Sequence, residues 1–156
     1  MSERQAHTSA VLIAVSLGIL LAMPCHRLWA QTVTVSGDPG MLTVGSAPPG
    51  SPLDPASDAS TTYTVTTTAA GQRIVARLDT PLPSGVTLTV SLTPPSGAAN
   101  EGEITLSTVD QTVVGSIPAA GTYSGLAITY RLAAVTAAGP VPTTVRSVVL
   151  TVVPGS

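Results

Sequence analysis

Short runs in which apolar and polar residues alternate follow one another from residue 32 to residue 153. Alternation with a period of two places successive side chains on opposite faces of a β-strand. Glycine and proline interrupt these runs at intervals that are too short for helices. The pattern predicts strands at Thr32–Val35, Met41–Val44, Thr61–Thr68, Gln72–Leu78, Val86–Leu92, Glu103–Ser107, Gln111–Ser116, Gly125–Ala134 and Thr144–Val153.

Most of these runs keep their apolar residues on one side, with threonine, serine or arginine between them. Strands with one apolar face bury that face against each other, and two packed antiparallel sheets are the economical solution. We therefore predict an all-β chain that folds as an immunoglobulin-like antiparallel β-sandwich of about seven to nine strands. The predicted inward residues are Tyr63, Val65, Ile74, Ala76, Leu78, Val86, Leu88, Val90, Leu92, Ile104, Leu106, Leu126, Ile128, Tyr130, Leu132, Val148, Leu150 and Val152.

Residues 1–30 have the layout of a signal peptide. A polar start carries Arg4, an apolar run extends over residues 10–23, and a proline then breaks the helix. We expect cleavage before Gln31, which makes the mature protein an exported one. A retained membrane anchor is the alternative, although the run is short for a bilayer span. The residues before Cys25 also loosely resemble the lipobox of bacterial lipoproteins.

The expected cleavage divides the chain into four parts. Residues 1–30 form the signal peptide, 31–45 an N-terminal β arm or first strand, 46–60 a linker or loop rich in Pro, Gly and Ser, and 61–156 the sandwich body. Closely spaced prolines hold the linker extended because they fix φ and remove amide donors. The arm pairs either within its own sandwich or along the edge of a neighbouring molecule. We favour pairing in cis because it closes a shorter loop.

The expected cleavage also changes the chemistry that the chain can carry. Residues 31–156 contain no histidine, cysteine, tryptophan or lysine. Their four arginines stand against seven acidic residues, which gives a net charge of about −3. Nucleic-acid binding needs clustered basic residues, so we expect no nucleic-acid partner. We also expect no membrane span after processing.

The remaining residue types argue against catalysis. The usual bases that activate a Ser or Thr nucleophile are His and Lys, and no Gly-x-Ser-x-Gly elbow is present. Zinc and copper sites need His or Cys, so only an oxygen-ligated ion such as calcium stays open. We predict that the protein is not an enzyme, with no catalytic, cofactor-binding or metal-binding residues and no cofactor. The acidic residues that could supply a carboxylate pair or part of a calcium site are Asp54 with Asp58, Glu101 with Glu103, Asp79 and Asp110.

One local motif supports the sandwich. The segment Gly121-Thr122-Tyr123-Ser124-Gly125 resembles the tyrosine corner of immunoglobulin-type sandwiches, in which the Tyr hydroxyl bonds back to nearby backbone. Similar Gly-Thr-Tyr-Ser segments followed by alternating residues occur near the ends of bacterial secreted surface proteins. The chain thereby resembles their spore-coat-protein-U-like and pilin-like subunits. The resemblance implies an exported subunit that assembles into a fibre or coat.

The expected function is that of an exported, non-enzymatic structural or surface-assembly protein, such as a noncovalent fibre or coat subunit. The Thr- and Val-rich, lysine-free composition and the separate N-terminal arm motivate this expectation. Its expected partners are further copies of itself or other surface proteins, outside the cell or in the periplasm. The alternative is a secreted β-sandwich module that binds carbohydrate or protein.

Overall fold

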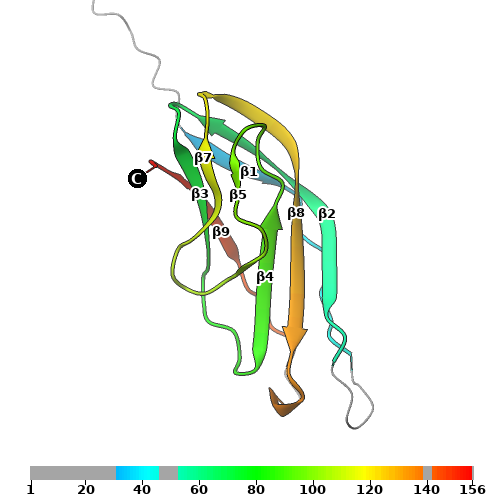
Figure 1. Cartoon of the computed structure of the whole chain (residues 1–156). Coiled ribbons are helices and arrows are strands. Elements are labelled where there is room, and N and C mark those ends of the chain that lie inside the picture. Colours follow the sequence, from blue (N-terminus) through cyan, green and yellow to red (C-terminus); the bar gives the residue numbers. More distant parts are fainter. Residues whose placement is uncertain (1–30, 46–52, 139–141, 156) are drawn as a thin grey trace, which may run out of the picture.

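The computed structural model describes residues 31–45, 53–138 and 142–155. The expected signal peptide and residues 46–52 of the expected linker therefore lie outside the described residues. The described residues form nine strands and one short 3₁₀ helix (Figure 1). The elements are β1 Thr32–Ser36, β2 Ala56–Thr67, β3 Gln72–Leu78, β4 Val86–Leu92, β5 Ala99–Asn100, β6 Ile104–Thr105, β7 Gln111–Ile117, β8 Gly121–Ala134, the 3₁₀ helix Thr136–Ala138 and β9 Val148–Val153.

The nine described strands form two antiparallel sheets that share one core. Sheet A has five strands in the order β1-β2-β8-β4-β6, and sheet B has four strands in the order β5-β7-β3-β9. Buried apolar residues from both sheets form a single cluster between them, and Figure 1 shows the two layers. The predicted all-β sandwich is confirmed at this level.

The core follows the alternation seen in the sequence. Tyr63 and Val65 of β2, Ile74 of β3, Val90 of β4 and Ile128 of β8 are each at most 1% exposed. Burying a side chain of the size of valine or isoleucine contributes about 1.5–3 kcal/mol. Threonine and serine occupy most of the positions between the inward residues of β2 and β4, so the strand faces that point to solvent carry hydroxyls.

Strand β7 departs from simple alternation. Val113 and Val114 are neighbours in the sequence, yet both are fully buried. The reason lies in the pairing with β3, where Val75 pairs with Thr112 but Ile74 pairs with Val114. The extra residue in β7 forms a β-bulge, which interrupts the alternation of side chains between the two faces. A period-two reading of the sequence places only one of the two valines in the core.

The predicted strand at Met41–Val44 is wrong, because residues 38–45 have no regular structure. Pro39 has no amide hydrogen to donate to a ladder. The backbone N–H of Gly40 donates to the carboxylate of Asp58 instead of to a strand. Strand β2 begins at Ala56, so residues 56–60 of the expected linker belong to a strand.

The predicted strand at Glu103–Ser107 is also reduced. The chain first pairs with sheet B as β5, then bends, and then pairs with sheet A as β6. Gly102 lies at this bend with a left-handed φ of 76°, which glycine adopts at little cost. Of the predicted strand only Ile104–Thr105 pairs in a sheet, and β5 at Ala99–Asn100 lies where the alternation predicts no strand.

The last strand begins at Val148, later than the predicted Thr144. The N–H of Ser147 donates to a carboxylate oxygen of Asp79 at 3.0 Å. An amide that is bonded to a side chain does not enter the ladder, which starts one residue later.

Candidate functional site

The hydrogen bond to nearby backbone that a tyrosine corner at Tyr123 implies is present. Strand β8 begins at Gly121, so Tyr123 lies inside the strand rather than before it. Its hydroxyl donates to the carbonyl oxygen of Ala119 at 3.2 Å. Gly125, where the predicted strand begins, has a φ of 68° and lies at a bulge in β8. The hydroxyl of Tyr123 therefore ties the β7–β8 connection to the strand that follows it.

The other two tyrosines are buried. Tyr63 is 1% exposed and Tyr130 is 5% exposed. The hydroxyl of Tyr63 donates to the carbonyl oxygen of Thr93 at 2.7 Å. Burial raises the pKa of Tyr63, and burial together with the carboxylate of Asp58 raises the pKa of Tyr130. Both rings are part of the core, and neither presents a face on which a sugar ring can stack.

The acidic residues that the sequence pairs are held by different partners. Asp58 accepts hydrogen bonds from the hydroxyl of Ser60 at 2.8 Å and from its N–H at 3.1 Å, while Asp54 is exposed. These hydrogen bonds lower the pKa of Asp58. Asp79 accepts the N–H of Ser147 and the N–H of Thr80, and these bonds lower the pKa of Asp79.

Glu103 and Asp110 likewise have separate contacts. Glu103 accepts the hydroxyl hydrogen of Thr89 and lies 3.6 Å from Arg131, so the pKa of Glu103 is lowered, first by Thr89. Asp110 lies 3.4 Å from Arg77. Within the described part of the chain, no group of three or more His, Cys, Asp or Glu residues is placed to hold a metal ion.

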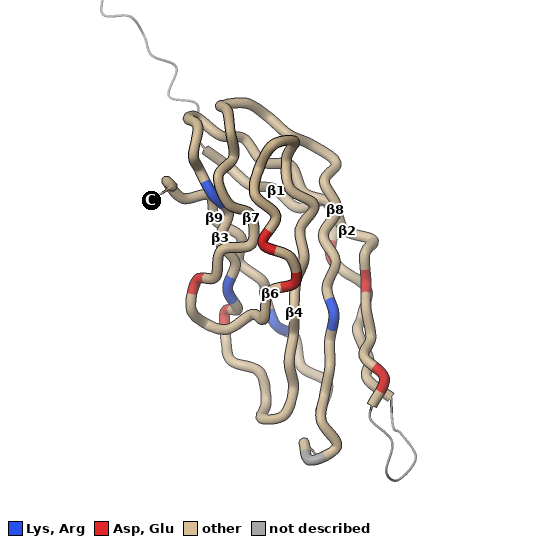
Figure 2. Tube along the Cα trace, viewed as in Figure 1, with Lys and Arg blue, Asp and Glu red and all other residues tan. Residues whose placement is uncertain are grey.

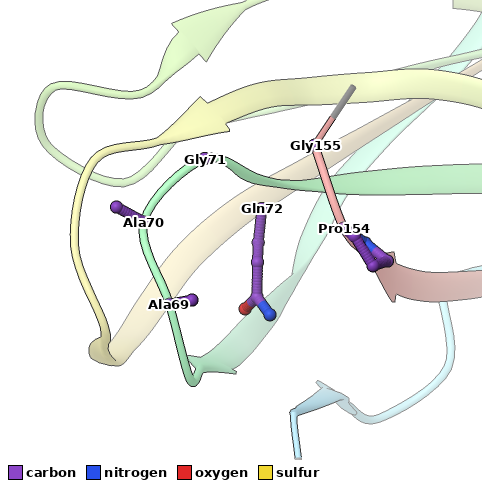
Figure 3. A pocket seen from close by; sticks show the side chains of 6 residues that line it. All are labelled: Ala69, Ala70, Gly71, Gln72, Pro154 and Gly155. Atoms are coloured by element: carbon purple, nitrogen blue, oxygen red, sulfur yellow. The ribbon is translucent and has the colours of Figure 1, made fainter.

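An open hollow of about 470 Å³ lies where the end of the described chain passes the β2–β3 turn (Figure 3). Its lining is small side chains and backbone, with Gln72 as the one large polar group. The amide nitrogen of Gln72 donates to the side chains of Gln31 and Thr68. A Cβ added at Gly155 would lie only 1.9 Å from the carbonyl oxygen of Gly71. The hollow thus lies where two backbone segments cross closely, and its lining provides few polar side chains for binding or catalysis.

Hydroxyl groups pair across β1, β2 and β8 on the outer face of sheet A. The hydroxyls of Ser36 and Thr62 are 2.6 Å apart, and those of Thr66 and Thr122 are 3.0 Å apart. Cross-strand pairs of this kind stabilise a sheet by roughly 0.2–1 kcal/mol each. The hydroxyl residues that face each other across β1 and β2 are Thr32 with Thr66, Thr34 with Thr64 and Ser36 with Thr62.

Strand β1 is held less firmly on its inner side. It pairs with β2 within the same chain, which is the cis arrangement that the sequence analysis favours. Only Val33 of β1 is half-buried and packs against the core, while its other four residues are exposed. The inward-facing Val35 remains 42% exposed. The first strand is therefore attached mainly by its backbone ladder and its hydroxyl pairs.

No family model matches this chain, and the searches of curated proteins and of solved structures give no match either. The helix among residues 31–45, 53–138 and 142–155 is the 3₁₀ turn Thr136–Ala138, which is too short to cross a membrane.

Proposed function

We propose that this protein is an exported, non-enzymatic subunit that assembles noncovalently at or near the cell surface, and that its sandwich is of the immunoglobulin-like kind. The observation that carries the proposal is the attachment of β1. It is an edge strand of sheet A that pairs with β2 alone and places one half-buried side chain, Val33, against the core. Such a strand is well suited to exchange between copies.

Exchange of this arm has a low cost because an arm from a second copy makes the same contacts as the cis arm does. Domain swapping reuses the native ladder in this way. The connection from β1 to β2 spans residues 37–55 and contains five prolines in the sequence, which favour an extended chain. If each copy passes its arm to the next one, the contact does not close and the product grows as a polymer.

The tyrosine corner at Tyr123 supports the immunoglobulin-like assignment because that contact recurs in such sandwiches. The composition of residues 31–156 supports the noncovalent character of the assembly. They contain no cysteine for a disulfide and no lysine for an isopeptide bond. The absence of histidine and lysine from the same residues supports a role without catalysis.

A pair of matched variants tests the proposal. Val33→Asp places a charge where the arm meets the core, whereas Val35→Asp places the same charge at a position that is 42% exposed. We expect the secreted wild-type protein to form polymers visible by negative-stain electron microscopy, Val33→Asp to form none, and Val35→Asp to form them to a reduced extent. Polymers of Val33→Asp equal to those of the wild type would rule out arm exchange.

The binding-module alternative gives a different result in the same experiment. A secreted sandwich that binds carbohydrate or protein as a monomer forms no polymer as wild type. It retains a ligand on a glycan array, where the assembly subunit is expected to retain none.

A further inference from the structure

The edge strands on the two sides of the sandwich differ in length and in charge. On one side β5 and β6 contain two residues each. Glu101 and Glu103 flank the bend between them at Gly102, and Figure 2 shows acidic residues at this bend, beside β6. Short strands, charges and bends are the devices by which proteins keep a sheet edge from pairing with another chain. This side is therefore protected.

Strand β9 forms the edge of sheet B on the other side and lacks these devices. It pairs with β3 over six consecutive residues without a bulge. Its sequence VVLTVV contains neither a charged residue nor a proline. Within the described chain β3 is the strand that pairs with it, and the nearby β1 belongs to the other sheet. A regular apolar edge of this kind is a template for pairing with another strand.

We propose that the outer edge of β9 binds the same edge of a second copy of this chain. Two copies of sheet B then join into one antiparallel sheet across a two-fold axis, which is an isologous contact. The inference rests on the proposed function and names an assembly surface for it. Arm exchange through β1 extends the assembly, and the β9 contact joins its units in pairs.

The chemistry of this edge favours a second copy as its partner. Two antiparallel β9 strands present N–H groups to C=O groups in both directions, so the main chain is complementary to itself. Strand β9 has no ionisable side chain, so two copies meet without repulsion between like charges. Its outward residues Val149 and Val153 are half-buried against β3, and the contact buries more of their apolar surface.

Charge substitutions at Thr151 test this contact. Thr151 is exposed in the middle part of β9, so Thr151→Lys brings two lysines together across the two-fold axis. We expect self-association of the secreted protein, measured by sedimentation equilibrium, to weaken at least about tenfold, because facing like charges strongly disfavour an interface. The matched control is Thr105→Lys, which adds the same charge to an exposed threonine of β6 on the protected side, and it should associate like the wild type.

A mixture gives the stricter test. Thr151→Glu should weaken association as Thr151→Lys does, and mixing the two variants should restore it because opposite charges then face each other. Circular dichroism of each variant checks that it is folded, and restored association in the mixture is itself a readout that a merely unfolded variant cannot give.

The outcomes separate the β9 contact from the proposed function. If Thr151→Lys associates like the wild type, or if the mixture is as weak as its components, the β9 contact is wrong while polymerisation through the arm still stands. If the wild-type protein is monomeric at every concentration, both the contact and the proposed function are wrong.

Discussion

The side-chain amide of Gln72 donates a hydrogen bond of 2.6 Å to the side-chain carbonyl of Gln31. Gln31 directly precedes β1 of sheet A, and Gln72 is the first residue of β3 in sheet B, so the bond fastens the root of the arm to the opposite sheet. Gln72 is 6% exposed. Its side-chain nitrogen also donates to the hydroxyl of Thr68, and its side-chain oxygen accepts the backbone N–H of Thr68. In the exchange that we propose, the incoming arm must offer the same carbonyl to Gln72.

Removing this fastening should loosen the arm. Gln72→Leu takes away the donor to Gln31 and the bonds to Thr68, and we expect it to lower the free energy of unfolding by about 1–2 kcal/mol. Amide hydrogen exchange of β1 should become faster than in the wild type, while that of β4 should change less. The control is Gln31→Leu, which removes only the bond to the arm and should speed exchange of β1 with a smaller loss of stability. Unchanged exchange of β1 in both variants would show that the bond does not hold the arm.

The tyrosine corner should contribute to stability through its hydroxyl. Tyr123→Phe keeps the ring and removes the hydrogen bond to Ala119, so we expect a loss of about 1 kcal/mol in urea unfolding. Thr87→Val serves as a control because it also removes a hydroxyl, from an exposed position on β4. Equal midpoints for Tyr123→Phe and the wild type would show that the contact is incidental.

Two left-handed glycines provide a matched comparison. Gly125 and Gly85 have φ values of 68° and 79°, so an alanine at either position should cost about 1–2 kcal/mol. A Cβ at Gly125 meets nothing within 4 Å, whereas a Cβ at Gly85 lies 2.8 Å from the Cβ of Ala138. We therefore expect Gly85→Ala to be destabilising by about a further 1–3 kcal/mol in thermal unfolding. The reverse order would contradict the placement of the 3₁₀ helix over Gly85.

Acid should weaken the fold through Asp79. Its pKa lies below the usual 3.8, first because it accepts the N–H of Ser147. A carboxyl group whose folded pKa is depressed contributes stability above its unfolded pKa and loses it as the pH falls through the folded one. We expect the midpoint of unfolding to decrease when the pH is lowered below about 4. The decrease should be smaller in Asp79→Asn. Added salt should change this difference little, because hydrogen bonds dominate over the charge of Arg146. An identical acid profile for Asp79→Asn would contradict this role.

Alternation predicts the inward residues of the central strands, although Val75 of β3 is buried as well, between Ile74 and Ala76. It fails at Val113 and Val114, where a bulge places neighbours on one face, and the pairing with β3 that creates this bulge is a long-range contact. It also predicts a strand at Met41–Val44, where the amide of Gly40 is used by the distant Asp58. A single sequence contains no local signal for either event.

The candidate surfaces were less accessible to sequence analysis than the fold. The residues of β9 look like those of any buried strand, and only the strand order makes them an unprotected edge. The carboxylates considered for a partial calcium site do not come together, since Glu103 and Asp110 lie close to arginines of different sheets. The tyrosine corner was predictable because its contact spans only four residues.

The proposed assembly needs contacts between copies of the sandwich that are not covalent. Sedimentation velocity of the secreted protein over a wide concentration range tests it most directly. We expect species larger than a dimer that grow with concentration and dissociate in urea without a reducing agent. A single monomeric species at the highest attainable concentration would contradict it.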